Sequence, residues 1–161
     1  MGKKKVNKKE ENPMLIFAWT VSFKRENVCI GEIDGKKKYR KKLVFMKKYP
    51  KIIPDGVSQE KISSSWNELY FKIERLLHRG YNVMGGVYCE DKETGQKGIS
   101  VCSSFETKFS ISRGIRIAKC RVFNELIKKE NYDISVFEEK GYLLDKKDTK
   151  YIKKVIKRKG K

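Results

Sequence analysis

The chain begins with two short runs of β-branched and aromatic residues, 14–23 and 27–33, separated by a polar break. Such runs are typical of strands, because branched and aromatic side chains pack well on a pleated sheet. Asp34 and Gly35 follow, and this pair predicts a type I′ turn because both residues tolerate a positive φ. The sequence therefore predicts a hairpin. Its second limb, residues 36–48, begins as KKKYRKK and soon turns apolar as LVFM.

A helix is predicted between about Gln59 and Arg79, because apolar residues recur there every three or four positions. These residues are Ile62, Trp66, Leu69, Tyr70, Ile73, Leu76 and Leu77. Gly80 is the expected end of this helix. We expect Trp66, together with Trp19 of the first strand, to lie in the core.

A second helix is expected from somewhere between Lys108 and Ser112 to about Lys129. Its inner stripe would be Ile111, Ile115, Ala118, Val122 and Leu126. At 100° per residue, the opposite half of the cylinder carries Arg113, Arg116, Arg121 and Lys128. The outer surface of this helix is therefore predicted to be basic.

Between the two helices, segments 82–91 and 97–104 flank Glu93-Thr94-Gly95, which suits a hairpin with a three-residue loop. That loop would place Cys89 opposite Ile99 and turn Cys89 and Cys102 to opposite faces of the sheet. We therefore expect no disulfide between these two cysteines.

The pattern as a whole predicts an α+β fold: an antiparallel sheet of about five strands with two main helices on one face. Residues 1–12 are expected to be a disordered basic arm, 13–144 a single domain, and 145–161 a basic C-terminal helix or tail at the edge of the sheet. Within the last two segments, 133–138 is a candidate strand and Thr149 a candidate helix cap. An exposed sheet edge would also allow pairing of two copies as a homodimer.

Charge adds the strongest indication of a partner. Lysine and arginine outnumber the acids 39 to 20, which gives a formal net charge of +19. Almost all of the excess lies in three segments: 1–12 (+3), 36–48 (+8) and 145–161 (+7). In a chain this basic the cations repel one another unless a polyanion neutralises them. The alternative is that the lysine runs are solvated surface or tails with no anionic partner.

Arginine grips phosphate with a planar fork, and lysine attracts it as a mobile point charge. The sequence therefore predicts non-catalytic, weakly sequence-specific binding of nucleic acid, DNA or RNA, through the lysine-rich limb and the second helix. Serines at the start of that helix add a phosphate cradle, and Tyr39 is a candidate for stacking on a base. The candidate residues are Lys36, Lys37, Lys38, Tyr39, Arg40, Lys41, Lys42, Ser110, Ser112, Arg113, Arg116, Arg121 and Lys128.

The stretch ISVCSSFETKFSISRGIRIAKCR combines an apolar-Cys-Ser strand end, a Phe-Ser step and arginines on a helix. Over residues 82–125 this order resembles a family of small phage-encoded proteins that includes the Thoeris anti-defence sponges. The resemblance implies a role in host-defence evasion, in which a cyclic nucleotide signal is bound without catalysis. It also implies that Arg113, Arg116 and Arg121 grip the phosphates of the ligand.

Other classes have less support. The four cysteines form no CxxC pair and there is one histidine, so we expect no metal site and no cofactor. Asp55, Glu90 and Asp91 could supply the carboxylates of a metal-dependent nuclease, which is the one enzymatic function that we consider. With no long apolar segment, we expect no membrane partner and a reduced, cytoplasmic protein, in the host cell if viral. An inhibitor that docks on an acidic or nucleic-acid-binding protein surface would use the same charge.

Overall fold

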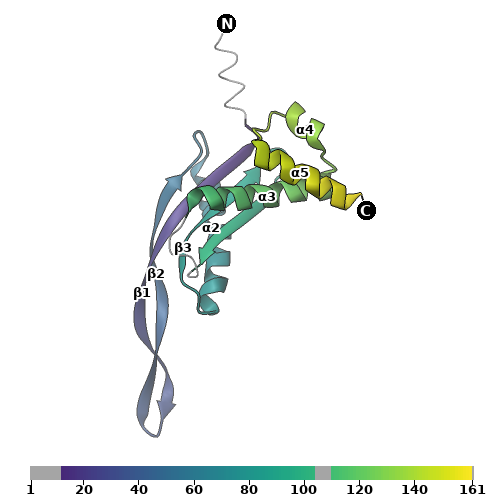
Figure 1. Cartoon of the computed structure of the whole chain (residues 1–161). Coiled ribbons are helices and arrows are strands. Elements are labelled where there is room, and N and C mark those ends of the chain that lie inside the picture. The colour runs from purple at the N-terminus through teal and green to yellow at the C-terminus, as the bar shows by residue number, and fades with distance from the viewer. Residues whose placement is uncertain (1–11, 104–109, 161) are drawn as a thin grey trace.

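The computed structural model describes residues 12–103 and 110–160 (Figure 1). In that part of the chain four strands form one antiparallel sheet, in the order β2-β1-β3-β4. The strands are β1 (Met14–Ile33), β2 (Lys36–Ile52), β3 (Val83–Asp91) and β4 (Lys97–Ser103). The helices are α2 (Gln59–His78), α3 (Ile111–Glu130), α4 (Ile134–Glu139) and α5 (Lys146–Lys159). None of these helices combines the length and apolar character needed to cross a membrane.

The predicted α+β class with an antiparallel sheet is confirmed. The two runs 14–23 and 27–33 are continuous in β1, so the five predicted strand segments form four strands. The turn is also as predicted, with φ of 53° at Asp34 and 76° at Gly35. Because β1 pairs with β3 only from Met14 to Thr20, the far halves of β1 and β2 project as a two-stranded hairpin beyond the body (Figure 1).

The prediction that both main helices lie on one face is wrong. Phe17 and Trp19 of β1 pack against α2, whereas Ile16 and Ala18, which point the other way, pack against the cluster that contains α3. Side chains alternate along a strand, so α2 and α3 cover opposite faces of the sheet. The sequence MLIFAWTV is apolar at nearly every position, and such a run indicates a strand that is buried on both faces.

Helix α2 is held on its face of the sheet by aromatic packing and by a close contact with Gly86 of β3. The rings of Trp19 and Trp66 meet edge to face, with centroids 5.4 Å apart, so both tryptophans lie in the core as predicted. A Cβ on Gly86 would stand 2.6 Å from a methyl carbon of Leu69, so the missing side chain lets α2 approach the sheet. The helix begins after Ser58, whose hydroxyl accepts a hydrogen bond from the Lys61 amide.

The α3 face also carries the C-terminal helix. Ile152 and Val155 of α5 are buried in the same cluster as α3, so α5 packs on α3 instead of lying at the sheet edge. The helix starts after Asp145, not at Thr149, because Asp145 and Asp148 form a reciprocal capping box. The candidate strand at 133–138 is wrong, because Ile134–Glu139 forms helix α4, which begins after Asp133. The expected disorder of residues 1–12 falls almost wholly outside the described residues.

The register predicted for the β3–β4 hairpin is wrong by one residue. Cys89 lies opposite Gly98, not Ile99, so Cys89 and Cys102 share a face of the sheet, although both are free thiols. The turn explains the shift. The buried carboxylate of Asp91 accepts hydrogen bonds from the amide and hydroxyl of Thr94, at 2.9 and 2.6 Å, and from the Tyr142 hydroxyl. These bonds fix a four-residue loop instead of the three-residue loop.

Candidate nucleic-acid interface

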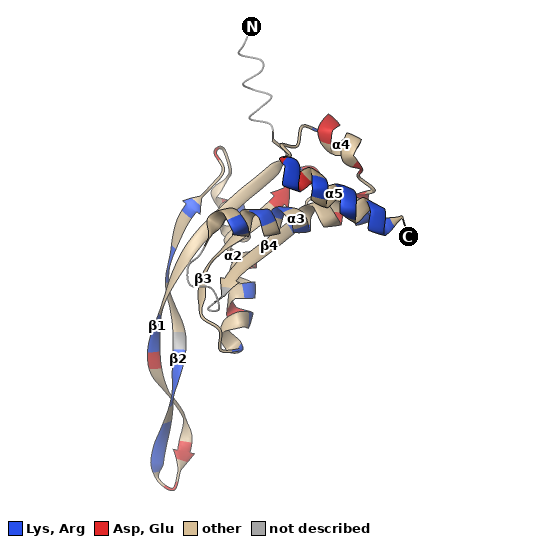
Figure 2. Ribbon diagram, in the orientation of Figure 1, with Lys and Arg blue, Asp and Glu red and all other residues tan. Residues whose placement is uncertain are grey.

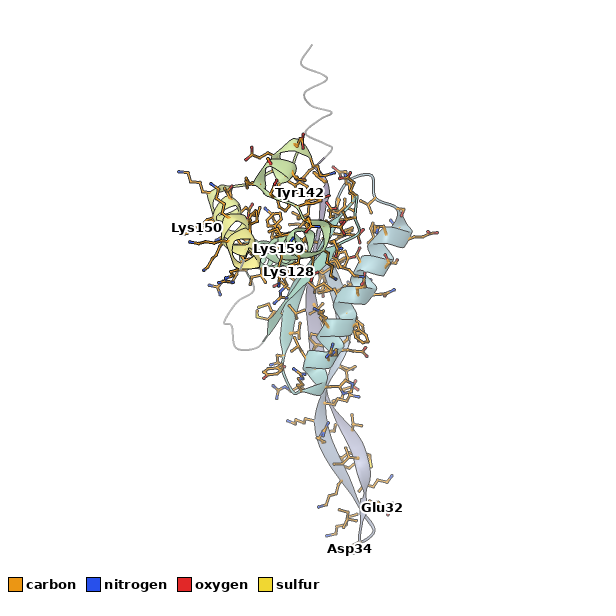
Figure 3. The ribbon with its side chains drawn as sticks, turned by 90° about the vertical axis from the view of Figure 1, so that its right-hand side faces the viewer. Glu32, Asp34, Lys128, Tyr142, Lys150 and Lys159 are labelled. Carbon is orange, nitrogen blue, oxygen red and sulfur yellow. The ribbon has the colours of Figure 1, made fainter. Side chains whose placement is uncertain are left out.

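The projecting part of the β1–β2 ribbon, residues 24–42, is here called the basic hairpin. It carries eight lysines and arginines against three acids, Glu26, Glu32 and Asp34. Every residue from 29 to 42 is exposed, so these side chains do not serve a core. Figure 2 shows the basic residues along the ribbon, and Figure 3 places Glu32 and Asp34 at its far tip. The cations therefore line the flanks of the hairpin as far as the turn, where Lys36 and Lys37 lie opposite Ile33 and Glu32.

The strand register shows how little of this charge is balanced within the hairpin. Opposite charges stabilise a sheet when they lie directly across from each other. Lys37 faces Glu32 and Lys42 faces Glu26. Four further cations face neutral residues: Lys36, Lys38, Arg40 and Lys41 lie opposite Ile33, Gly31, Val28 and Asn27. The hairpin thus presents cations that its own strands do not neutralise.

The body continues this charge where the base of the hairpin meets the C-terminal end of α2. A cavity of about 360 Å³ is lined by the hairpin cations Arg25, Arg40, Lys41 and Lys42, and by His78 and Arg79 at the helix end. On the core side, Phe45 packs edge to face on Tyr70, with ring centroids 5.1 Å apart. This contact holds the base of the ribbon against α2.

A second concave region follows the free edge of β4, between α2 and α3. It consists of a cavity of about 660 Å³ and an adjoining one of about 210 Å³, here together called the β4-edge groove. Glu68, Phe71, Lys72, Arg75 and Arg79 of α2 line it, and their spacing of three and four places them on one flank of the helix. The other wall includes Arg121, Asn124 and Glu125 of α3.

Arg79 lines both the cavity at the hairpin base and the β4-edge groove. The two edges of the sheet are therefore connected around the C-terminal end of α2. The residues of this connection, here called the cationic track, are Arg25, Arg40, Lys41, Lys42, Arg79, Arg75, Lys72 and Arg121. A phosphate backbone that followed the track would meet cations from β1, β2, α2 and α3.

The glutamates at the groove are occupied by other partners. Glu68 accepts hydrogen bonds from Tyr88 at 3.1 Å and from Lys97, and Glu125 pairs with Lys129 at 3.1 Å. Burial, followed by the hydrogen bond to Glu90, raises the pKa of Tyr88 well above its usual range, so its hydroxyl stays a neutral donor. Among the described residues no salt bridge engages Lys72, Arg75 or Arg79. The groove therefore has a net positive character.

The residues predicted from the sequence separate into two groups. Lys36 to Lys42 all lie on the hairpin, with the Tyr39 side chain 60% exposed, and Arg121 lies in the β4-edge groove. The expectation that the whole basic face of α3 joins the hairpin in one surface is wrong, because β2 and β4 are opposite edges of the sheet and α3 covers the face away from α2. Only Arg121 of that helix reaches the track.

The other predicted residues on α3 have separate surroundings. The Ser110 hydroxyl caps the helix by accepting from the Arg113 amide at 3.3 Å, and Ser112 is exposed in the first turn. Arg116 is exposed and lies near enough to the α5 cap to lower the pKa of Asp145, after the larger effect of the Asp148 amide. Figure 3 places Lys128 beside α5, away from the hairpin. Arg116 and Lys128 thus lie near α5, and Figure 2 shows basic residues along both α3 and α5.

The α2 residues Phe71, Lys72, Arg75 and Arg79 were not predicted as functional. One signal was present in the sequence: Phe71 falls outside the apolar stripe of its helix, so a large aromatic ring was left without a core position. The cations beside it look like any solvated helix flank. Only the packing of α2 against the sheet shows that this flank borders the free edge of β4.

Asp91 and Glu90 do not form a metal centre with their neighbours. The Asp91 carboxylate is used by the β3–β4 turn, and Glu90 pairs with Lys61 at 2.7 Å and accepts from Tyr88 at 2.5 Å. Within residues 12–103 and 110–160, no group of three or more histidine, cysteine or acidic residues is placed to hold a metal ion.

Comparisons of the chain with protein-family models, with curated proteins and with solved structures give no match.

Proposed function

We propose that the protein binds nucleic acid without catalysis, with weak sequence specificity, through the basic hairpin and the cationic track. The observation that carries this proposal is the hairpin: a two-stranded ribbon with exposed cations, most of them opposite neutral residues. A hairpin of two strands is only marginally stable in water, and mutual repulsion of its lysines weakens it further. Phosphate groups along its flanks would remove that repulsion.

The shape of the hairpin suits the same partner. A two-stranded ribbon fits the major groove of a DNA duplex, and ribbons also serve as readers in the minor groove. The cations of the hairpin would contact phosphates, which position a protein without reading sequence. The proposed binding is therefore governed by charge and shape, and we assign no base-specific contact to the hairpin.

The test is the salt dependence of binding. Each phosphate contact releases counterions and adds about 0.9 units to the slope of log K against log salt on duplex DNA. With the eight hairpin cations available, we expect a slope steeper than about −4, measured by fluorescence anisotropy with a labelled 20-base-pair duplex. No measurable binding at low salt would refute the proposal.

The same titration separates the two alternatives. A cyclic nucleotide carries few phosphates, so a sponge of the kind implied by the resemblance would show a slope of about −2 or weaker for its ligand and little affinity for the duplex. Of the three arginines that the resemblance implies, Arg121 lines the larger cavity of the β4-edge groove. Its volume of about 660 Å³ suits a small ligand. An inhibitor that docks on an acidic protein would not bind the cyclic nucleotide, and it would bind its protein partner more tightly than the duplex.

A further inference from the structure

We propose that the β4-edge groove holds a single-stranded segment of nucleic acid, with one base stacked on the ring of Phe71. This inference rests on the proposed function and names the form of nucleic acid that one part of the surface takes. Single-strand binders combine a positive groove, which follows the backbone, with exposed aromatic rings on which bases stack. Both elements are present in the β4-edge groove.

Phe71 supplies the aromatic element. Phe71 is 62% exposed, although it lies in the middle of a helix whose other large apolar residues pack in the core. On the same flank of α2, Lys72 lies next to it and Arg75 follows one turn later. A base stacked on the ring would thus have cations close to its own phosphate.

The walls and floor of the groove suit a nucleotide. Asn67 of α2 and Asn124 of α3 line opposite walls, and each amide group can both donate and accept hydrogen bonds at a base edge. Gly98 forms part of the floor, and its lack of a side chain lets α3, which carries the opposite wall, pack close to β4. Arg121 adds a guanidinium group from the α3 side. The groove therefore offers a ring, amides and cations around one open space.

An extended peptide that joins the free edge of β4 is the main competing occupant. Such a peptide needs the outward backbone groups of β4 for its hydrogen bonds. One of these, the Ile99 carbonyl, already accepts a hydrogen bond from the Arg121 guanidinium. A peptide would have to displace that bond, whereas a nucleic acid makes its main contacts to side chains. A second copy of this chain would bring another net charge of +19 to a cationic groove. The observations thus favour nucleic acid.

The experiment compares a labelled oligo-dT strand with a duplex of the same length, using wild-type protein and the variant Phe71→Ala. Loss of one stacked base lowers single-strand affinity by about five- to 150-fold. We expect that loss for the single strand and little change for the duplex, which keeps its base pairs. Phe71→Tyr, which retains the ring, should restore most of the affinity. Leu143→Ala, at a comparably exposed apolar residue (65%) outside the groove, should have no effect.

The outcomes separate this inference from the proposed function. If wild-type protein binds both nucleic acids but Phe71→Ala leaves single-strand affinity unchanged, the stacking site is refuted and the basic hairpin stands. If wild-type protein binds neither, both proposals fail. The groove would belong to a protein partner if an alternating Glu-Leu peptide bound there, lost affinity in Phe71→Ala, and did not compete with oligo-dT. That result would also overturn the inference.

Discussion

Replacement of Lys36, Lys38 and Lys41 together by glutamine is expected to reduce the slope of log K against log salt by about three units. These residues face Ile33, Gly31 and Asn27 across the hairpin, so their removal breaks no cross-strand charge pair. The fold should persist, and nucleic-acid affinity near physiological salt should fall roughly a hundredfold. Fluorescence anisotropy with a labelled duplex at several salt concentrations measures both quantities.

The matched control removes the same charge from a different surface. Lys150, Lys153 and Lys157 are exposed on α5, which packs on the face of the sheet opposite α2. Their replacement by glutamine gives the same net charge as the hairpin variant. If the α5 variant lost as much affinity and slope as the hairpin variant, net charge alone would explain binding, and the hairpin would have no special role.

Gly98→Ala is expected to be strongly destabilising. A Cβ at this position would stand 2.3 Å from the Ala118 carbonyl oxygen and 2.7 Å from the Arg121 Cβ, so it would meet the body of α3 and not a flexible side-chain end. Helix α3 would have to move away from β4. Overpacking of this kind costs about 1–3 kcal/mol, and more where backbone atoms must shift. Urea unfolding followed by circular dichroism measures the loss.

Gly160→Ala is the control for that experiment. A Cβ there would lie 3.6 Å from the nearest heavy atom, which is an ordinary contact, and the φ of −68° suits any residue. We expect a change within about 0.5 kcal/mol. Equal stability of the two variants would show that α3 does not pack on Gly98 as closely as described. The position of Arg121 in the β4-edge groove would then be in doubt as well.

The sequence allowed correct prediction of the elements whose local signals are strong. The period of three and four gave α2 and α3, and Asp34-Gly35 gave the turn of the long hairpin. The register of the second hairpin was missed because it depends on bonds that Asp91 makes within its turn and to Tyr142, 51 residues away. Such long-range contacts leave no local pattern in the sequence.

The candidate site was only half predictable for a related reason. The cations of the hairpin were evident from the sequence, because every residue from 36 to 42 except Tyr39 is a lysine or arginine. The part played by α2 depends on which face of the sheet that helix covers. MLIFAWTV indicates burial of β1 on both faces, but it does not say which helix takes which face. The flank with Phe71 and Arg75 becomes notable only when it is seen beside the edge of β4.

The most direct measurement of the central claim uses the cysteine of the basic hairpin. Cys29 is exposed and lies opposite Tyr39, whereas Cys120 is half-buried on α3, which packs on the body of the sheet and not on the hairpin. Cys89 provides an internal blank, because burial raises its pKa to about 12 and keeps its thiol unreactive. We predict that saturating nucleic acid slows alkylation of Cys29 by iodoacetamide, that high salt restores the rate, and that Cys120 is unaffected. An unchanged Cys29 rate on a protein shown to be bound would contradict the account.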